Sequence, residues 1–151
     1  ARALQFGQLV GALVQAGDEG VAFFQGLEQP AVVGAHVGQV YQFSVPRTEK
    51  ITMDGMEIPP SMGLGTALNF QPTGSGKAAI TGDFVLAPAE VNPVIRALRK
   101  HNIMVTALHS HMLTEEPRLF FMHFWAVDDA LMLARGLRGA LDQTASIKAS
   151  K

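Results

Sequence analysis

The order of hydrophobic patterns in the second half of the chain is the feature that most constrains the fold. The patterns read as strand, helix, strand, strand and helix, over residues 77–86, 87–100, 103–112, 118–127 and 128–144. Only a short polar break separates the two consecutive strands, so we expect them to form an antiparallel hairpin. Helices with an apolar stripe must bury it on another element, and this order therefore indicates an α+β fold.

The first half of the chain adds strands to the same sheet. Residues 31–45 are rich in β-branched and aromatic side chains, and their second half alternates apolar and polar residues. Asp54-Gly55 lies between two apolar arms and predicts a hairpin with a type I′ turn. The fold prediction is therefore a single antiparallel β-sheet with helices packed on it, whose C-terminal half has the order β-α-β-β-α.

The chain divides into three parts, without an internal repeat or a linker. Residues 1–30 are predicted to be an N-terminal helical segment, because apolar residues recur at helical spacing over residues 4–16 despite two glycines. Residues 31–144 form the α+β domain. Residues 145–151 have no core pattern and are predicted to be a flexible tail.

Composition excludes several classes of protein. The 151-residue chain has a net charge of −1 and no basic stripe, so a nucleic-acid partner has no electrostatic support. It has no cysteine, which excludes disulfides and thiolate ligands, and no apolar run reaches the ~20 residues of a transmembrane helix. Hydrophobic residues make up 48% of the chain and charged residues only 17%, and this spare apolar surface predicts a homo-oligomer.

Three of the five histidines fall within the predicted hairpin. His109 and His111 are two residues apart and therefore project from the same face of their strand. If the hairpin is centred near residue 116, His109 lies opposite His123, and all three imidazoles share that face. A register slip of one residue would move His123 to the other face. Three imidazoles on one face predict a site for a divalent transition metal, zinc first, with copper, nickel or iron as alternatives.

Two acidic residues are candidate catalytic groups beside that metal. Glu116, like its neighbour Glu115, stands at the end of the predicted hairpin, where it would be a fourth ligand or a general base. Asp83 follows a glycine and would orient a histidine. Plainer alternatives stay open, namely turn residues for the acids and a hydrogen-bonded polar sheet face for the histidines. Arg47 would pair either with a substrate carboxylate or with an internal acid.

The sequence from about residue 40 to residue 144 resembles the LppY/LpqO family. The most specific parts of the resemblance are the strings GDFVL, TALHSH, EEPR and MHFWA. The family is known mainly as a bacterial domain of unknown function, and some of its members look like secreted proteins or lipoproteins. The resemblance implies that the family's histidines fall at His109, His111 and His123, and that the two candidate acids and Arg47 lie in family motif segments. It also implies a secreted, periplasmic or cell-envelope location.

Two classes of function follow from these observations. The first is a metal-binding domain with a three-histidine site on a β-hairpin, acting as a metal-dependent hydrolase in which Glu116 or Asp83 assists. The second is a non-catalytic secreted protein, which binds a small-molecule ligand at the same histidines or assembles into a structure through its apolar surface. The chain begins at Ala1 without a methionine, as a trimmed secreted precursor would, and a cytoplasmic location is left open.

Overall fold

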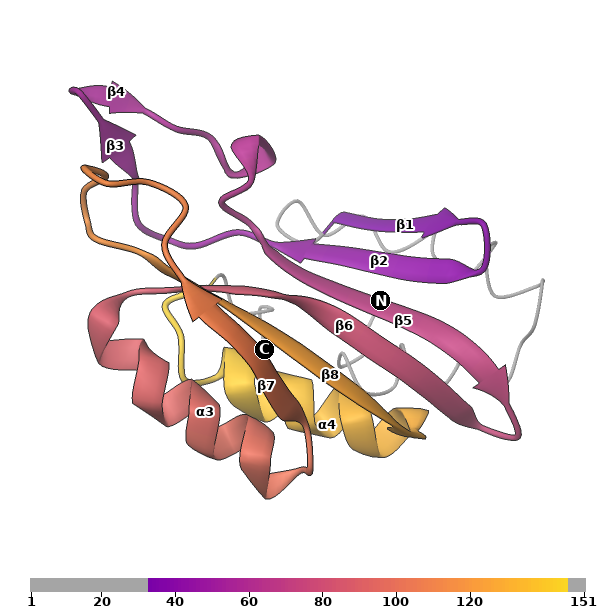
Figure 1. Cartoon of the computed structure of the whole chain (residues 1–151). Helices are drawn as coiled ribbons and strands as arrows, with labels where there is room; N and C mark the ends of the chain where they lie inside the picture. The colour runs from indigo at the N-terminus through magenta and orange to yellow at the C-terminus, as the bar shows by residue number, and fades with distance from the viewer. Residues whose placement is uncertain (1–32, 147–151) are drawn as a thin grey trace, which may run out of the picture.

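A computed structural model describes residues 33–146, and within them the main feature is a six-stranded antiparallel sheet (Figure 1). Across the sheet the strands run in the order β1-β2-β5-β6-β8-β7, and every neighbouring pair is antiparallel, as the sequence predicted. The strand bounds are Val33–Val37 for β1, Val40–Val45 for β2, Thr66–Gly74 for β5, Lys77–Leu86 for β6, Met104–His109 for β7 and Phe120–Asp129 for β8.

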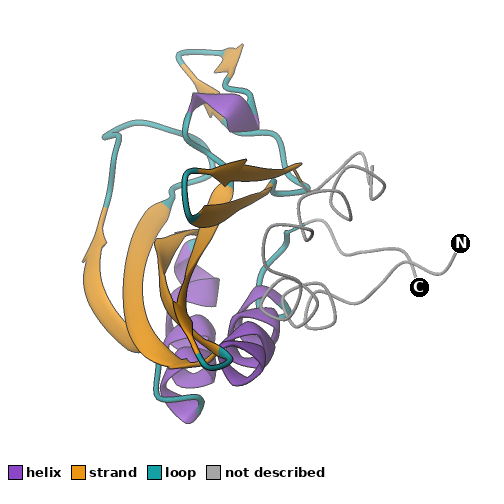
Figure 2. Ribbon diagram, turned by 90° about the vertical axis from the view of Figure 1, so that its right-hand side faces the viewer, coloured by secondary structure: helices purple, strands orange, loops and turns teal. Residues whose placement is uncertain are grey.

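Two α-helices cover one face of this sheet. A 3-10 turn at Pro88–Glu90 leads from β6 into α3, Val91–Lys100, and α4 spans Ala130–Leu141 after β8. The helices lie side by side beneath the strands in Figure 1, and Figure 2 shows both on the same side of the curved sheet. The chain passes through α3 from β6 to the edge strand β7, and β8 then returns between these two strands. This is the predicted β-α-β-β-α half of an α+β fold.

Alternation along the strands separates a helix-covered face from an open face. The helix-covered face holds the main hydrophobic core, whose large, fully buried side chains include Leu68, Phe70, Ile80, Phe84, Leu98, Met122, Phe124 and Leu133. Each such side chain stabilises the fold by roughly 1.5–3 kcal/mol relative to an exposed position. The core therefore determines which side chains of each strand are left on the open face.

The segment between β2 and β5 forms a small lobe, residues 50–65, that lies apart from the sheet it was expected to extend. Its two short strands, β3 at Thr52–Met53 and β4 at Met56–Glu57, make a separate two-stranded sheet, and a 3-10 turn follows at Pro60–Met62. The turn between β3 and β4 is type I′ as predicted, with φ of 51° at Asp54 and 77° at Gly55.

A second hydrophobic cluster holds the small lobe against one end of the open face. Its buried members are Ile51, Leu64, Val85, Leu119 and Phe121. Val85 and Phe121 face each other across β6 and β8, so the lobe covers this end of the open face. The small lobe packs its apolar residues on the face of the sheet and does not extend the edge of the sheet. The sequence pattern predicts strands in both cases, so it did not show where the lobe lies.

A buried ion pair, the Arg47–Glu90 clasp, joins the chain after β2 to the start of α3. Arg47 is buried and donates hydrogen bonds to both carboxylate oxygens of Glu90, at 2.7 and 3.1 Å, and to the Val85 carbonyl at 2.7 Å. Glu90 also accepts from the backbone N–H groups of Ala87 and Ala145, both at 2.7 Å. Of the two partners that the sequence allowed for Arg47, the internal acid is the one observed.

The clasp changes the expected boundary of the C-terminal tail. The sequence predicts a flexible tail from residue 145, but Ala145 and Ser146 belong to the folded domain. The Ala145 carbonyl accepts a hydrogen bond from the Thr48 N–H at 2.9 Å, and Ser146 is buried and forms an isolated bridge with Arg47. Satisfied backbone groups hold these two residues in place. The rest of the predicted tail, residues 147–151, and the helical segment predicted over residues 1–30 lie outside the described residues.

The remaining differences from the predicted secondary structure lie at the ends of helices and strands. The closing helix begins at Ala130 because Asp129 is its N-cap, with a side-chain oxygen that accepts from the Met132 N–H at 2.8 Å. β7 ends at His109 and not at residue 112. None of the helices in the described part of the chain is long and apolar enough to cross a membrane.

Candidate metal centre

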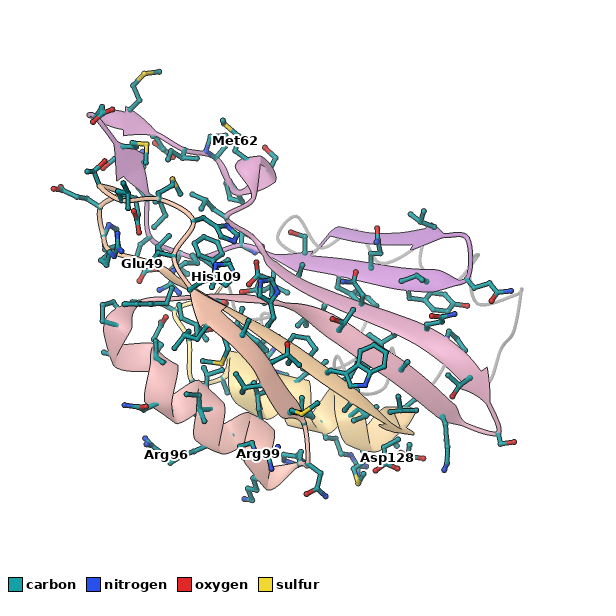
Figure 3. The ribbon with its side chains drawn as sticks, in the orientation of Figure 1. Glu49, Met62, Arg96, Arg99, His109 and Asp128 are labelled. Carbon is teal, nitrogen blue, oxygen red and sulfur yellow. The ribbon has the colours of Figure 1, made fainter. Side chains whose placement is uncertain are left out.

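The three predicted histidine ligands come together on the open face, where β7 and β8 meet. His123 lies on β8, which is bonded to β6 on one side and to β7 on the other. His109 is the last residue of β7, as Figure 3 shows, and His111 follows in the connection to β8. His109 and His111 are exposed and His123 is half-buried, so solvent and ligands reach the site directly.

The ring nitrogens converge closely enough to share one ion. Nε2 of His123 lies 2.9 Å from Nε2 of His109. One ring nitrogen from each of His109, His111 and His123 lies within 4.8 Å of the other two. Nitrogen ligands of a tetrahedral zinc ion stand about 3.3 Å apart, because Zn–N distances are ~2.0–2.1 Å. Small torsional adjustments of exposed side chains would therefore complete a three-histidine metal site.

The predicted pairing of His109 directly with His123 was wrong, because the actual strand register differs from the predicted one by two residues. His109 pairs with Phe121, and Ala107 pairs with His123. Side chains alternate with a period of two, so a shift of two residues leaves all three histidines on one face. An irregularity between Val105 and Ala107 disrupts the ladder near this point. His109 and His123 are consequently diagonal neighbours, and their rings meet across the diagonal.

His123 is held with one ring nitrogen directed at the other histidines. Its Nδ1 lies 3.2 Å from the carbonyl oxygen of Gly82 on β6, where it donates a hydrogen bond in the neutral Nδ1–H tautomer. The lone pair is then on Nε2, which faces His109. Metal-binding histidines commonly donate their second N–H to a backbone carbonyl in this way.

Gly82 is a site residue that the sequence analysis did not identify. A Cβ at this position would collide with the carbonyl oxygen of Ala67 on β5 and would lie 2.8 Å from the Phe124 ring. The close approach of the neighbouring strand therefore requires glycine here. The available signal was a glycine inside a predicted strand, which often marks a close backbone approach.

His111 is positioned by ring stacking. Its ring lies nearly parallel to that of Phe121, with centroids 3.5 Å apart and an interplanar angle of 15°. Phe121 is buried and belongs to the cluster that anchors the small lobe. A hairpin centred near residue 116 already places His111 opposite Phe121, but it did not predict that the two rings stack.

Of the two predicted catalytic acids, Asp83 is the one that lies beside the histidines. It pairs with His123 across β6 and β8, and its Oδ1 is 4.0 Å from Nδ1 of His123. That oxygen is buried and has no hydrogen-bond partner among the described residues. Burial raises the pKa of Asp83, while positive charge on the three histidines acts in the opposite direction. An unpaired carboxylate oxygen beside three imidazoles is a set of donor atoms that favours a cation.

The two acids of the β7–β8 connection have other partners. The Glu116 backbone pairs with Thr52 of the small lobe, with N···O distances of 2.8 and 2.9 Å, and its exposed carboxylate is not part of the histidine group. Glu115 is buried and accepts from the Leu119 N–H at 2.9 Å, with Arg118 at 3.4 Å. Glu115 is therefore a structural anchor of the connection, and a catalytic role for Glu116 stays a prediction.

Two clefts in the described chain lie away from these histidines. One is between α3 and α4, where Arg96, Lys100 and Gln143 contribute to its lining. The other lies between Arg47 and the small lobe. Because His109 and His111 are exposed, a ligand of the histidines would bind on an open sheet face and not in an enclosed cavity.

Comparison with known proteins identifies a family but no activity. No curated protein and no solved structure matches the chain. One family model, described as a domain of unknown function (DUF1259), matches residues 31–143, which is well over half of the chain and includes the three histidines and Asp83. The chain therefore belongs to this DUF1259 family of unknown function.

Proposed function

We propose that this domain binds one divalent transition-metal ion through His109, His111 and His123. The observation that carries the proposal is the convergence of their ring nitrogens, with 2.9 Å between Nε2 of His109 and Nε2 of His123. Without an ion, this contact requires one of the two rings to carry its proton on the nitrogen that faces the other. With an ion, both nitrogens donate lone pairs to one centre, and His123 keeps its hydrogen bond to Gly82.

Zinc is the metal that we propose first, with copper, nickel and iron as alternatives. Imidazole suits all four ions, whereas calcium and magnesium prefer oxygen ligands. Three histidine ligands leave a coordination position for water or a ligand, which is the pattern of catalytic zinc sites. A bound metal would supply Lewis-acid polarisation of an oxygen at that position.

A metal-dependent hydrolase is the activity that this arrangement supports best, with Asp83 as the assisting acid. The unpaired Oδ1 of Asp83 stands 4.0 Å from Nδ1 of His123. The carboxylate would orient the histidine ring and offset the positive charge of the ion. Glu116 is the second candidate acid, on a connection whose backbone is bonded to Thr52 of the small lobe.

The exposure of the histidines favours a second candidate function, a binding protein without catalysis. His109 and His111 face solvent, whereas catalytic metal sites gain from excluding water. Such a protein would hold a metal or a small ligand outside the cytoplasm, secreted or in the cell envelope. The resemblance to the LppY/LpqO family supports that location and is part of the same proposal. A homo-oligomer formed through exposed apolar side chains is a further part of it.

Metal analysis of the full-length, tag-free protein tests the metal site. We expect about one equivalent of zinc, copper, nickel or iron per chain, either as isolated or after titration. The variant His109→Ala/His123→Ala should lose it. His101→Ala is the matched control, because His101 is the C-cap of α3 and lies outside the histidine group. The proposal fails if the wild-type protein takes up no metal on titration, or if the double variant still binds it.

Turnover separates the two candidate functions. Zinc-loaded protein would be assayed with p-nitrophenyl acetate and bis-p-nitrophenyl phosphate. Hydrolysis that is lost in Asp83→Asn at a zinc concentration that saturates the variant supports the hydrolase. Stoichiometric metal without turnover of either ester favours the binding protein.

A further inference from the structure

A row of polar side chains that ends in a tryptophan and a methionine crosses the open face next to the histidines. Strand pairing aligns Gln42 with Asn69, Asn69 with Thr81, and Thr81 with Trp125, on β2, β5, β6 and β8. Met104 on β7 pairs with Trp125 and ends the row. These five residues are called the Trp125 row, and their side chains lie on the same face because the pairing keeps them in register.

The side chains of the Trp125 row are available to a ligand. Trp125 is 43% exposed, and Gln42, Thr81 and Met104 are also exposed, while Asn69 is half-buried. Among residues 33–146, no hydrogen bond engages the side-chain amides, the threonine hydroxyl or the indole N–H of this row. The row therefore offers a large aromatic surface and a line of unused hydrogen-bonding groups.

The chemistry of the row selects one class of ligand. It contains no ionisable side chain, so neither a cation nor an anion gains an ion pair there. An indole also stacks on nucleobases, but binding of a nucleic-acid strand requires lysines and arginines along its path, and the chain has a net charge of −1. An uncharged sugar matches the aromatic surface and the unused hydrogen-bonding groups of the row. Its C–H face packs on an indole, and its hydroxyls pair with amides and hydroxyls. We propose that the Trp125 row binds an uncharged carbohydrate.

The dimensions of the row fit a short oligosaccharide. Neighbouring strands lie about 4.8 Å apart, so the three spacings from β2 to β8 make about 14 Å. That length exceeds one pyranose ring and accommodates a few linked rings. One ring would stack on Trp125, and the rings that follow would pass Thr81, Asn69 and Gln42.

The Trp125 row also adjoins the proposed metal. Trp125 is two residues from His123 on the same face of β8, about 6.5 Å along the strand. Thr81 stands in the same relation to Asp83 on β6. A sugar stacked on Trp125 would therefore place a neighbouring hydroxyl at the histidines. The inference that carbohydrate is the ligand class of the metal site rests on the proposed function, whereas binding along the row does not require a metal.

Trp125 is the only tryptophan in the chain, so its fluorescence reports on the row. The full-length protein, metal-free and zinc-loaded, would be titrated with cellohexaose, xylohexaose, maltohexaose and N-acetylchitohexaose up to millimolar concentration. We expect a saturable blue shift of the emission with at least one of these sugars in the metal-free protein, and tighter binding in the zinc-loaded protein. An anionic hexagalacturonate should bind more weakly than that sugar.

Variants separate the row from the metal site. The variants Trp125→Ala and Thr81→Ala should each weaken sugar binding about tenfold or more and keep the zinc stoichiometry. Sugar binding is measured by calorimetry for Trp125→Ala, which lacks the fluorophore, and by fluorescence for Thr81→Ala. Leu113→Ala removes an exposed apolar side chain outside the row and is the matched control. His109→Ala/His123→Ala should still bind the sugar, so failure of the metal proposal is distinguishable from failure of this one.

Three results would overturn carbohydrate binding by the Trp125 row, and a fourth would refute only its link to the metal. The first is the absence of a spectral change with any of the four neutral sugars, and the second is unchanged sugar affinity in Trp125→Ala. The third is a wild-type dimer that Trp125→Ala converts into a monomer, which would assign the row to contact between two copies. The fourth is a sugar affinity that zinc leaves unchanged, which would refute the link to the metal.

Discussion

Replacing Glu90 by alanine would show how much of the fold depends on the Arg47–Glu90 clasp. The Glu90 carboxylate accepts two hydrogen bonds from Arg47 and one each from the N–H groups of Ala87 and Ala145. The side chains of Arg47 and Glu90 are only 2% and 13% exposed, so water does not replace the lost partners. Breaking a buried pair typically costs 3–5 kcal/mol. Arg47 keeps its ion pair with Glu49 at 2.9 Å, so we expect the free energy of unfolding to fall by about 3 kcal/mol, at the lower end of that range.

Urea unfolding of matched variants measures this loss. Glu49→Gln is the control, because Glu49 bonds to the same guanidinium but its side chain is 40% exposed, and it should cost less than about 1 kcal/mol. Arg47→Met removes the charge and keeps much of the volume. The double variant Arg47→Met/Glu90→Ala should lose less than the sum of its single changes, because the second change removes the unpaired charge that the first leaves behind. Strictly additive losses would refute the reasoning.

The pH dependence of the clasp has a defined sign. Burial disfavours the charge of Glu90, but hydrogen bonds from Arg47, Ala87 and Ala145 outweigh it and hold the pKa of Glu90 below its ordinary value of 4.5. The unfolded chain therefore binds this proton more tightly than the folded protein. The stabilisation is complete above pH 4.5 and is lost as the pH falls through the lower folded pKa. The stability difference between wild type and Glu90→Gln should shrink over that window, and a constant difference would contradict the argument.

Three further changes test the open face and the start of α4. Asp83→Asn removes a half-buried carboxylate whose buried Oδ1 has no described partner, so the metal-free protein should gain about 1 kcal/mol in urea unfolding, and lower stability would contradict this. Calorimetry should show about tenfold weaker zinc binding by the same variant. Gly82→Ala should cost about 3 kcal/mol in thermal unfolding, because its Cβ would collide with the Ala67 carbonyl oxygen, whereas Gly139→Ala, whose Cβ meets nothing within 4 Å, is the control. Asp129→Ala removes the N-cap hydrogen bond of α4 and should cost about 1 kcal/mol in the same assay, with Asp129→Asn close to wild type.

The period of a β-strand explains why the face of the candidate site was predictable and its contacts were not. His109, His111 and His123 share a face for any register that differs by an even number of residues. The actual register includes an irregularity between Val105 and Ala107. It arises where Val105 packs against the main core, and no local sequence pattern shows that packing. The prediction therefore placed the three histidines together on one face and paired two of them wrongly.

Long-range partners account for the rest of what the sequence did not show. Asp54-Gly55 and Asp129 determine a turn and a helix start through their own backbone neighbours, so local patterns predicted them closely. Arg47 and Glu90, in contrast, are 43 residues apart in the chain. Nothing near Arg47 in the sequence distinguishes an internal acid from a ligand. The same holds for residue 145, which has no core pattern in the sequence but is held in the folded domain by its hydrogen bond to Glu90.

The positions of the three histidines bear on which metal would fit the proposed site. His123 would be the rigid ligand, because β8 is bonded on both sides and its Nδ1 is held by the Gly82 carbonyl. His109 ends an edge strand, and His111 lies beyond it, stacked on Phe121. One of the three imidazoles is thus held in place, and the other two can adjust their positions. Zinc has no geometric preference from its d electrons, whereas copper(II) and nickel(II) favour square-planar or tetragonal sites. The proposed site, with three histidines that approach from one side of a sheet, would therefore suit zinc better than copper(II) or nickel(II).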